Sequence, residues 1–505
     1  MQLNRSKNSI RNSVWGVLNK LVAMFLPFLV RTVLLKKLGE EYLGLSGLFT
    51  AILSVLSLTE CGFGAAIVYS MYKPIADDDE ETLCALLSYY RKIYHIVGLV
   101  ILVIGTALFP ALPHLIRGDY PTDINLYVLY VIYLANTVIS YFLFAYETSL
   151  LSAYQRNDIT SNLNTAVKFI TSVFQIIVIF TLRNYTAFVL VIPATTVLNN
   201  LFTHLCAKRL FPALKPKGVV SDGLRGSIKK QVVGLFVERL SSITSNSVDH
   251  IFISAFIGLT AVAIYSNYYY IIFAVYGFLD VLCVSMQAGI GNSIALEAKE
   301  KNYSDFKKFS FLFSWLVSVC TVCVFCLIQS FMVVWVGNAL SLPLLSAILF
   351  AVYFYSMTIQ DICYQYYNAN GLWWHSRYRA LIVTVVNIVL NFCFVQKFGI
   401  NGIIIATVIS QFIGDIWKII ILFREYFNDY RVFEYVFIIL KNIILTLLAS
   451  FISFVICSHI KTNLVFALLI YALISFLISN LTLLVCNWYT KLFKESWKYI
   501  LRRFS

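Results

Sequence analysis

Charged residues are scarce in this chain of 505 residues. Asp, Glu, Lys and Arg make up 13% of the sequence, against roughly 25% in soluble proteins, while hydrophobic residues make up 60%. A soluble core cannot bury that much apolar surface, so the composition excludes a soluble globular protein.

Long polar segments and the common catalytic signatures are also missing. No nucleophile elbow, Walker loop or zinc-ligand spacing is found, which excludes direct nucleotide hydrolysis. No small-residue cleavage site follows the first apolar run, so we expect an uncleaved signal anchor. The loops predicted to lie outside are too short to hold the catalytic domain of a typical membrane glycosyltransferase or polymerase.

The eleven cysteines lie mostly within apolar runs. Cys320, Cys323 and Cys326 share one helix face at three-residue spacing, but no histidine stands near them. Buried cysteine commonly packs as a small hydrophobic residue. We therefore expect a structural role for these thiols and no cofactor.

Apolar stretches of roughly 20 to 28 residues fill the chain from Val14 to Trp488. A bilayer core of about 30 Å requires about 20 apolar residues in a helix, and such a helix satisfies its own backbone hydrogen bonds. The sequence predicts an all-α polytopic membrane protein with about fourteen transmembrane helices. The expected spans are 13–35, 44–72, 91–113, 124–150, 160–182, 185–207, 231–257, 260–290, 308–336, 341–368, 378–398, 400–423, 434–458 and 463–487.

The distribution of basic residues indicates the orientation, because cytoplasmic loops retain Lys and Arg. Arg5, Lys7 and Arg11 precede the first span, and further basic residues lie in 208–230 and 491–503. We expect both termini in the cytoplasm. The formal net charge of +14 then reflects topology and attraction to anionic membrane lipid, and it does not indicate nucleic-acid binding.

Two short matches indicate an internal repeat. KLGEEYLG at 37–44 corresponds to FIGLTAVA at 256–263, and GFGAAI at 62–67 corresponds to GIGNSI at 289–294. Each pair occupies matching topological positions, which favours two parallel six-helix lobes related by a pseudo-two-fold axis. The expected divisions are an N-terminal lobe (1–210), a cytoplasmic linker (211–230), a C-terminal lobe (231–423), two added helices (424–487) and an amphipathic cytoplasmic tail (488–505).

Three segments resemble the Wzx-type polysaccharide repeat-unit flippases, in the superfamily that also contains the lipid II flippase and the multidrug and toxic compound extruders. They are LGEEYLGL at 38–45, LTECGFG at 58–64 followed by YKP at 72–74, and FGINGI at 398–403 followed by Ala406 and Thr407. The resemblance covers nearly the whole chain. It implies a central cavity, alternating access, and movement of an undecaprenyl-diphosphate-linked oligosaccharide from the inner to the outer leaflet.

Ionisable residues within the spans are candidates for the transported chemistry, since each costs about 2.5 to 3.5 kcal/mol at a helix centre. Arg31 matches a cavity arginine of the lipid II flippase when the Gly39 regions are aligned, and its fork of donors suits a diphosphate. Lys20 lies about three turns earlier and could face the same wall. Glu60 could line the cavity or neutralise these bases.

Further candidates lie in the second half. The repeat places His250 opposite Arg31 as either a proton switch or a core residue, and Asp249 could bind a cation or pair with a base. Tyr269, in a run of three tyrosines, could stack against sugar rings. A further set of charged residues near span ends is equally well explained by side chains reaching to the interface: Glu147, Lys168, Glu238, Arg239 and Lys418.

Asn387 and Asn391 lie four residues apart on one face, and Thr407 lies in the next span. Their spacing resembles a cation site of some lipid II flippases, with Asn391 in place of an aspartate and Glu238 or Asp249 as the carboxylate partner. The alternative is hydrogen bonding between helices. Coupling to Na⁺ or H⁺ stays open.

The predicted function is a flippase in the bacterial cytoplasmic membrane, working with lipid and with polysaccharide polymerase and glycosyltransferase partners, and not an enzyme. Two alternatives stay open: a cation-coupled multidrug antiporter of the same fold, and a membrane glycosyltransferase or repeat-unit polymerase. Arg31 and Lys20 argue against a pathway for cationic drugs. A purely structural scaffold leaves the buried charges unexplained.

Overall fold

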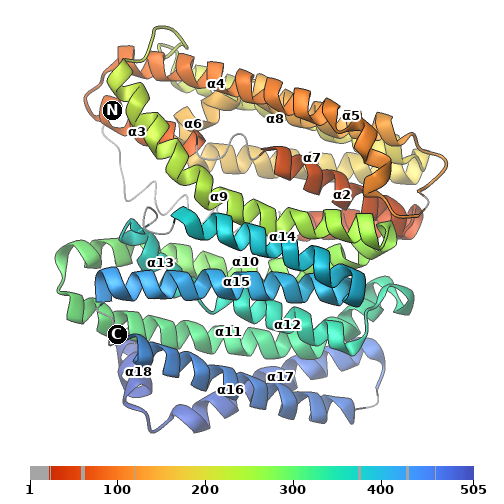
Figure 1. Cartoon of the computed structure of the whole chain (residues 1–505), viewed down its shortest axis with the longest axis vertical. Coiled ribbons are helices and arrows are strands. Elements are labelled where there is room, and N and C mark those ends of the chain that lie inside the picture. The colour runs from red at the N-terminus through yellow and green to blue at the C-terminus, as the bar shows by residue number, and fades with distance from the viewer. Residues whose placement is uncertain are drawn as a thin grey trace. The chain divides into compact units, whose positions relative to one another are not determined.

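The structure is a computed structural model that describes residues 22, 24–57, 63–118, 120–372, 377–427, 431–460 and 462–504. At 65, 227, 230–231, 233–246, 288, 295, 377 and 500–504 it describes the backbone alone. The described chain is helical and contains no strand. It divides into two compact units, one ending at Ala263 and the other beginning at Ile264. Within each unit, the long helices run roughly alongside one another (Figure 1).

The first unit begins with a helix through residues 24–37. The elements that follow are α2 (Glu40–Leu56), α3 (Phe63–Ala76), α4 (Glu80–Ala107), the 3₁₀ helix η2 (Phe109–Leu115), α5 (Leu126–Phe142), α6 (Ala145–Ala153), α7 (Asn157–Leu182), α8 (Tyr185–Leu210) and α9 (Asp222–Phe256). Its core is rich in aromatic residues. Phe49 of α2 packs edge-on against Tyr130 at 5.7 Å and in a tilted arrangement against Tyr133 at 5.5 Å, both on α5.

The helix α10 (Leu259–Leu296) begins in the first unit and continues into the second. The second unit then contains α11 (Lys299–Val336), η3 (Asn338–Leu340), α12 (Leu344–Thr358), α13 (Asp361–Ala369), α14 (Arg377–Phe398), α15 (Ile400–Leu422), the π-helical turn η5 (Phe423–Phe427), α16 (Val432–Ser458), α17 (Leu464–Asn487) and α18 (Lys491–Phe504). Phe306 is fully buried at the centre of an aromatic cluster with Tyr366, Phe427 and Tyr435.

The apolar outer face of these helices confirms a membrane protein. Phe437, Phe451 and Leu469 on α16 and α17 are 69%, 66% and 68% exposed, respectively. Apolar patches of this extent are not left in water by a monomeric soluble protein. The long hydrophobic runs of the sequence therefore face lipid on one side and pack against other helices on the other.

Ten helices in the described part of the chain are long and apolar enough to cross a membrane, and the pair α5 and α6 would be an eleventh. They match eleven of the expected spans. The other three, 13–35, 44–72 and 231–257, each include residues whose backbone or side chains are not described. The all-helical membrane fold is thus confirmed, while the number fourteen stays a prediction.

One span is sharply bent at a break where the sequence predicts a continuous helix. Residues 124–150 form α5 and α6, whose axes differ by 48°. At the break, Phe144 has a left-handed backbone with φ 53° and ψ 13°. A bulky residue in that region stores roughly 1 to 3 kcal/mol of strain, so the surrounding packing must hold it in place.

The first repeat match has a common backbone conformation. Gly39 and Gly258, which correspond in the two segments, have φ angles of 117° and 127°, and each directly precedes a helix, α2 or α10. Only glycine adopts this conformation readily. The second match cannot be compared in the same way, because Gly62 lies outside the described residues.

The tail forms the predicted amphipathic helix, α18. Phe493 is buried and packs on Trp315 of α11 at a centroid distance of 5.9 Å, while Lys491, Lys494 and Lys498 are exposed. The apolar face of α18 therefore packs on the second unit, and its basic face is free to contact anionic headgroups. The side chains of residues 500–504 are not described.

Candidate functional site

Arg31 lies half-buried on the helix of residues 24–37, next to the core residue Val30 and one turn before Leu34. Its Nε atom is buried. The Arg31 guanidinium therefore belongs to a partly packed face of an apolar helix. Lys20 and Glu60, its expected neighbours, lie outside the described residues.

Asp249 and His250 lie near the end of α9, in the same unit as Arg31. Asp249 is 1% exposed, and His250 is half-buried. All three side chains have interaction partners. The first unit therefore contains a buried carboxylate and a titratable ring on α9, and a guanidinium on its first described helix.

Tyr268 and Tyr269, in the tyrosine run on α10, have different surroundings. Tyr268 is fully buried; its hydroxyl donates to Gln329 Oε1 at 2.9 Å and accepts from the backbone N–H of Leu342 at 2.9 Å. Tyr268 is therefore a structural tie to α11 and the loop before α12. Tyr269 is half-buried and stacks on Phe273 at 4.3 Å, in an aromatic row that contains Tyr353.

Asn387, Asn391 and Thr407 come together between α14 and α15, as their spacing predicts. Asn387 Nδ2 donates to Thr407 Oγ1 at 3.3 Å and to Ser410 Oγ at 3.2 Å, and Asn391 Nδ2 donates to Asn387 Oδ1 at 3.2 Å. All four residues are 0% exposed. The described hydrogen bonds link the two helices, which is the alternative to a cation site that the sequence left open. A role of these residues in ion binding stays a prediction.

The carboxylates suggested to complete that cation site, Glu238 and Asp249, lie on α9 in the first unit. The side chain of Glu238 is not described. Among the side chains that are described, no three His, Cys, Asp or Glu form a group that could hold a metal ion.

A second set of charged side chains lies inside the second unit. Lys418 Nζ is 3.6 Å from Asp415 Oδ1, one turn away on α15, and 4.5 Å from the centre of the Tyr364 ring. The buried Arg379 of α14 also interacts electrostatically with the Asp415 carboxyl. Lys418 interacts electrostatically with Asp361 at the start of α13. Ion pairing within the unit, and not extension to the interface, therefore accounts for Lys418.

Glu147, another of the charged residues near span ends, also forms an interaction within its unit and does not reach to the interface. It is 8% exposed on α6, and both of its carboxylate oxygens lie near Nδ1 of His204 on α8, at 2.9 Å and 3.0 Å. The ring of Phe144 stacks on His204 with centroids 4.0 Å apart and planes 17° apart. Sequence reasoning missed His204, since 57 residues separate it from Glu147. A histidine and a glutamate within apolar spans were the available signal.

Two carboxylates outside the membrane spans have pKa values below the ordinary range. The side chain and backbone N–H of Thr82 hydrogen-bond to Asp79 at the start of α4 and lower the pKa of that carboxyl. Lys301 and the Ser293 hydroxyl likewise lower the pKa of Glu297 between α10 and α11. Both residues stabilise helix ends and lie apart from the candidate groups above.

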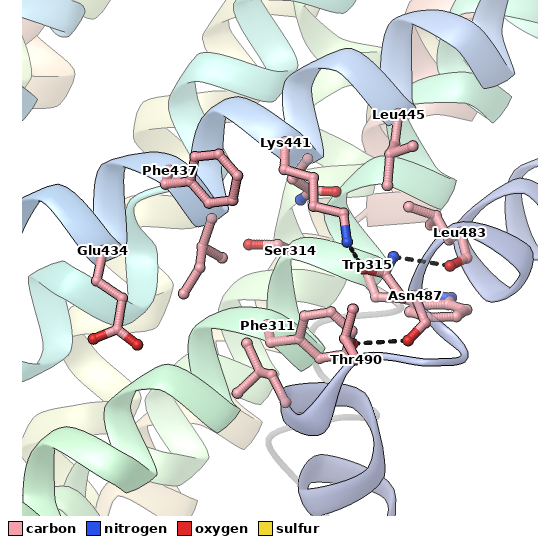
Figure 2. A pocket seen from close by; sticks show the side chains of 13 residues that line it. Phe311, Ser314, Trp315, Glu434, Phe437, Lys441, Leu445, Leu483, Asn487 and Thr490 are labelled. Atoms are coloured by element: carbon pink, nitrogen blue, oxygen red, sulfur yellow. Dashed lines mark hydrogen bonds between the residues drawn. The ribbon is translucent and has the colours of Figure 1, made fainter.

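A pocket of about 250 Å³ lies among α11, α16, α17 and the start of α18 (Figure 2). Its walls are mostly apolar and include Phe311 and Trp315. Lys441 projects toward it, with its ammonium donating to Asn487 Oδ1 at 2.7 Å and to the Cys486 carbonyl at 3.2 Å. The size and lining suit a segment of an aliphatic chain.

The sequence matches the model of a protein family described as polysaccharide biosynthesis protein, over residues 9–285. That match covers more than half of the chain. The chain belongs to this family. No curated protein matches the chain significantly.

Solved structures identify the fold. The chain is similar to a structure of the lipid II flippase MurJ in an inward closed conformation, with 16% identity and a TM-score of 0.66, over 94% of this chain and 98% of that one. It is also similar to an inward-facing MATE multidrug transporter of the MOP superfamily, with 15% identity and a TM-score of 0.56, over 80% and 97% of the two chains. A Vibrio cholerae MATE transporter, VcmN, matches with 15% identity and a TM-score of 0.54, over 86% and 100%.

These similarities confirm the predicted MATE-like fold for a member of the polysaccharide biosynthesis family. The chain is a multi-pass membrane protein of the polysaccharide biosynthesis family, and it has the fold that these flippase and transporter structures share. The solved structures with this fold are those of a flippase and of transporters, as the prediction of a flippase requires.

Proposed function

We propose that this protein translocates undecaprenyl-diphosphate-linked oligosaccharide repeat units from the inner to the outer leaflet of a bacterial cytoplasmic membrane, for assembly of a surface polysaccharide. The observation that carries the proposal is membership of the polysaccharide biosynthesis family combined with a flippase-like fold over nearly the whole chain. Polysaccharide polymerase and glycosyltransferases would be its partners in that assembly.

Arg31 is the proposed diphosphate contact. A diphosphate is doubly anionic, and a guanidinium can hold it with two parallel charge-assisted hydrogen bonds. Its position on the packed face of an apolar helix supports a fixed donor more than a side chain that reaches to the interface. Lys20, Glu60, His250, Asp249 and Tyr269 complete the proposed set of substrate-facing residues.

The membrane potential favours this direction of transport. An inside-negative potential is worth about 2.3 kcal/mol per charge per 100 mV, so two charges moving outward gain roughly 4.6 kcal/mol per 100 mV. Translocation of the diphosphate therefore does not require a coupled ion. Coupling to Na⁺ or H⁺ would add to the driving force.

The lipid part of the substrate needs an apolar path of its own. The pocket in Figure 2 has aromatic and aliphatic walls and a volume of about 250 Å³. We include it in the proposal as a contact for part of the polyprenyl chain. The amphipathic helix α18 next to it would lie at the cytoplasmic surface.

The test is translocation of a fluorescent undecaprenyl-diphosphate oligosaccharide in proteoliposomes under an imposed potential. We expect Arg31→Ala to abolish translocation and Arg31→Lys to impair it, because a single ammonium cannot replace the guanidinium fork. Lys36→Ala is the matched control, since Lys36 is an exposed cation on the same helix. Full activity in both folded Arg31 variants would remove Arg31 from the site while leaving the flippase proposal intact.

The competing proposal is a cation-coupled multidrug antiporter, which the MATE structures favour by fold alone. Such a protein would move a cationic dye in vesicles in exchange for Na⁺ or H⁺. Dye movement by the wild type, without movement of any lipid-linked oligosaccharide, would decide for the antiporter.

A further inference from the structure

The pair formed by the buried Glu147 and the half-buried His204 lies directly beside the break in the membrane span formed by α5 and α6. Glu147 is in the first turn of α6, and its backbone N–H donates to the carbonyl of Phe144 at 3.0 Å. Phe144 is the left-handed residue at the break, and its ring covers the imidazole of His204. One residue therefore links the ionisable pair to the strained backbone.

Glu147 and His204 lie at the same distance along the chain from the ends of their helices. Glu147 lies six residues before Ala153, the end of α6, and His204 lies six residues before Leu210, the end of α8. Six residues of helix span about 9 Å. Both helix ends face the side that the basic residues predict to be cytoplasmic, so we expect the pair to lie within the bilayer and close to its inner boundary.

The chemistry of the pair permits two charge states. When the Glu147 carboxylate is ionised, Nδ1 of His204 must carry a proton, because two acceptors cannot face each other at 2.9 Å. With a neutral imidazole, the pair then has a net charge of −1. Addition of one proton to the free Nε2 gives an imidazolium opposite the carboxylate and a net charge of zero. In a low-dielectric environment, this change of charge strongly alters the electrostatic energy of the pair.

The neighbouring helices contribute few other charges. Tyr146 on α6 interacts with Glu147, and Arg91 on α4 acts on Tyr146. Also on α4, His95 stacks on Phe142 at 5.1 Å.

The ionisable groups of the remaining neighbours are engaged elsewhere or exposed. At the start of α7, Asp158 pairs with Arg156 at 3.1 Å, and Lys168 is exposed. Lys73 on α3 is exposed, and α5 contains no Asp, Glu, Lys, Arg or His. The two described histidines at this break are therefore His204 of the pair and His95, which stacks on Phe142.

We propose that Glu147 and His204 form a proton-binding site whose occupancy sets the geometry of the α5–α6 break and thereby couples translocation to a proton gradient. Proton uptake changes the attraction between α6 and α8, and the stacked Phe144 ring transmits that change to the backbone at the break. The inference rests on the proposed function, since it names the ion to which the flippase responds.

The first test needs no substrate. The apparent Tm of the purified full-length protein is measured between about pH 5 and about pH 8, the range in which histidine changes charge. We expect the Tm difference between wild type and Glu147→Gln to change across this range, and the double variant with His204→Gln to lose no further pH dependence. Asp158→Asn is the matched control, and its difference from wild type should stay constant. A constant difference for Glu147→Gln would overturn the inference.

The second test measures translocation of the fluorescent lipid-linked oligosaccharide with and without a pH gradient, at zero potential. The wild type should respond to the gradient, while Glu147→Gln should translocate at one rate in both conditions. Glu147→Asp keeps the carboxylate and should retain part of the response even if Glu147→Gln folds poorly.

The outcomes separate the two proposals. A wild type that moves no lipid-linked oligosaccharide would contradict the proposed function. The Tm measurement would still test whether Glu147 and His204 bind a proton. A wild type that translocates without any response to the gradient, or a Glu147→Gln variant with the full response, would overturn the proton site and leave the flippase in place.

Discussion

At the residue scale, close contacts between backbones show why two sequence motifs contain glycine, one between α14 and α15 and one between α2 and the start of α10. A Cβ atom at Gly402 would lie 2.3 Å from the backbone oxygen of Phe394, and a Cβ atom at Gly44 would lie 2.2 Å from the backbone oxygen of Leu259. Backbone atoms cannot move aside as a flexible side chain can. Both glycines are therefore required by close approach of backbones, apart from any role in transport.

We predict that Gly402→Ala destabilises the protein by about 1 to 3 kcal/mol, the usual cost of overpacking. The expected observation is a lower apparent Tm in detergent. Gly226→Ala on α9 is the control, because no atom lies within 4 Å of its added Cβ and alanine favours a helix. A Tm of Gly402→Ala equal to that of Gly226→Ala would show that the α14–α15 contact is looser than described.

At the element scale, hydropathy predicts where helices lie but not where they break. The spans 124–150 and 341–368 each consist of two helices, with breaks at Leu143–Phe144 and at Ile359–Gln360. Neither break contains proline or glycine, so the sequence gives no local signal for it. The second break is held by tertiary contact, since the hydroxyl of Tyr435 on α16 donates to Gln360 Oε1 at 2.9 Å.

The same limit applies to the candidate site. Asn387, Asn391 and Thr407 were predictable as neighbours because a four-residue spacing and a short turn bring them together. The pairing of Glu147 with His204 depends on how α6 packs against α8, and periodicity carries no information on that contact. Local patterns thus identify residues on one face or one hairpin, while contacts between separate spans need the structure.

For the α14–α15 pair, we predict that Asn387→Leu lowers the apparent Tm to the same extent in Na⁺ and in K⁺ buffers. The expected loss is roughly 0.6 to 2 kcal/mol, as found for hydrogen bonds between membrane helices. Ser285→Ala is the control, because the Ser285 hydroxyl is exposed and bonds only within α10, to the Leu282 carbonyl. A wild-type Tm that rises with Na⁺ alone, and a variant that loses this rise, would instead support the cation site.

At the scale of the whole molecule, the proposed direction of transport depends on the orientation of the chain in the membrane. We predict that both termini are cytoplasmic, from the basic residues before the first span and on α18. A green fluorescent protein fused after Ser505 should fluoresce, and alkaline phosphatase fused there should be inactive. The same reporters placed after Asp123, between α4 and α5, should give the opposite result, and equal signals at both positions would contradict the orientation.

The comparisons place this chain in the polysaccharide biosynthesis family with a MATE-like membrane fold, and transport of a lipid-linked oligosaccharide is the central claim that goes beyond them. The most direct measurement compares two cargoes in the same proteoliposomes: a fluorescent undecaprenyl-diphosphate oligosaccharide and a cationic dye. We predict movement of the oligosaccharide lipid, faster under an outward-driving potential, and no movement of the dye above that in protein-free vesicles. Movement of the dye alone would contradict the account.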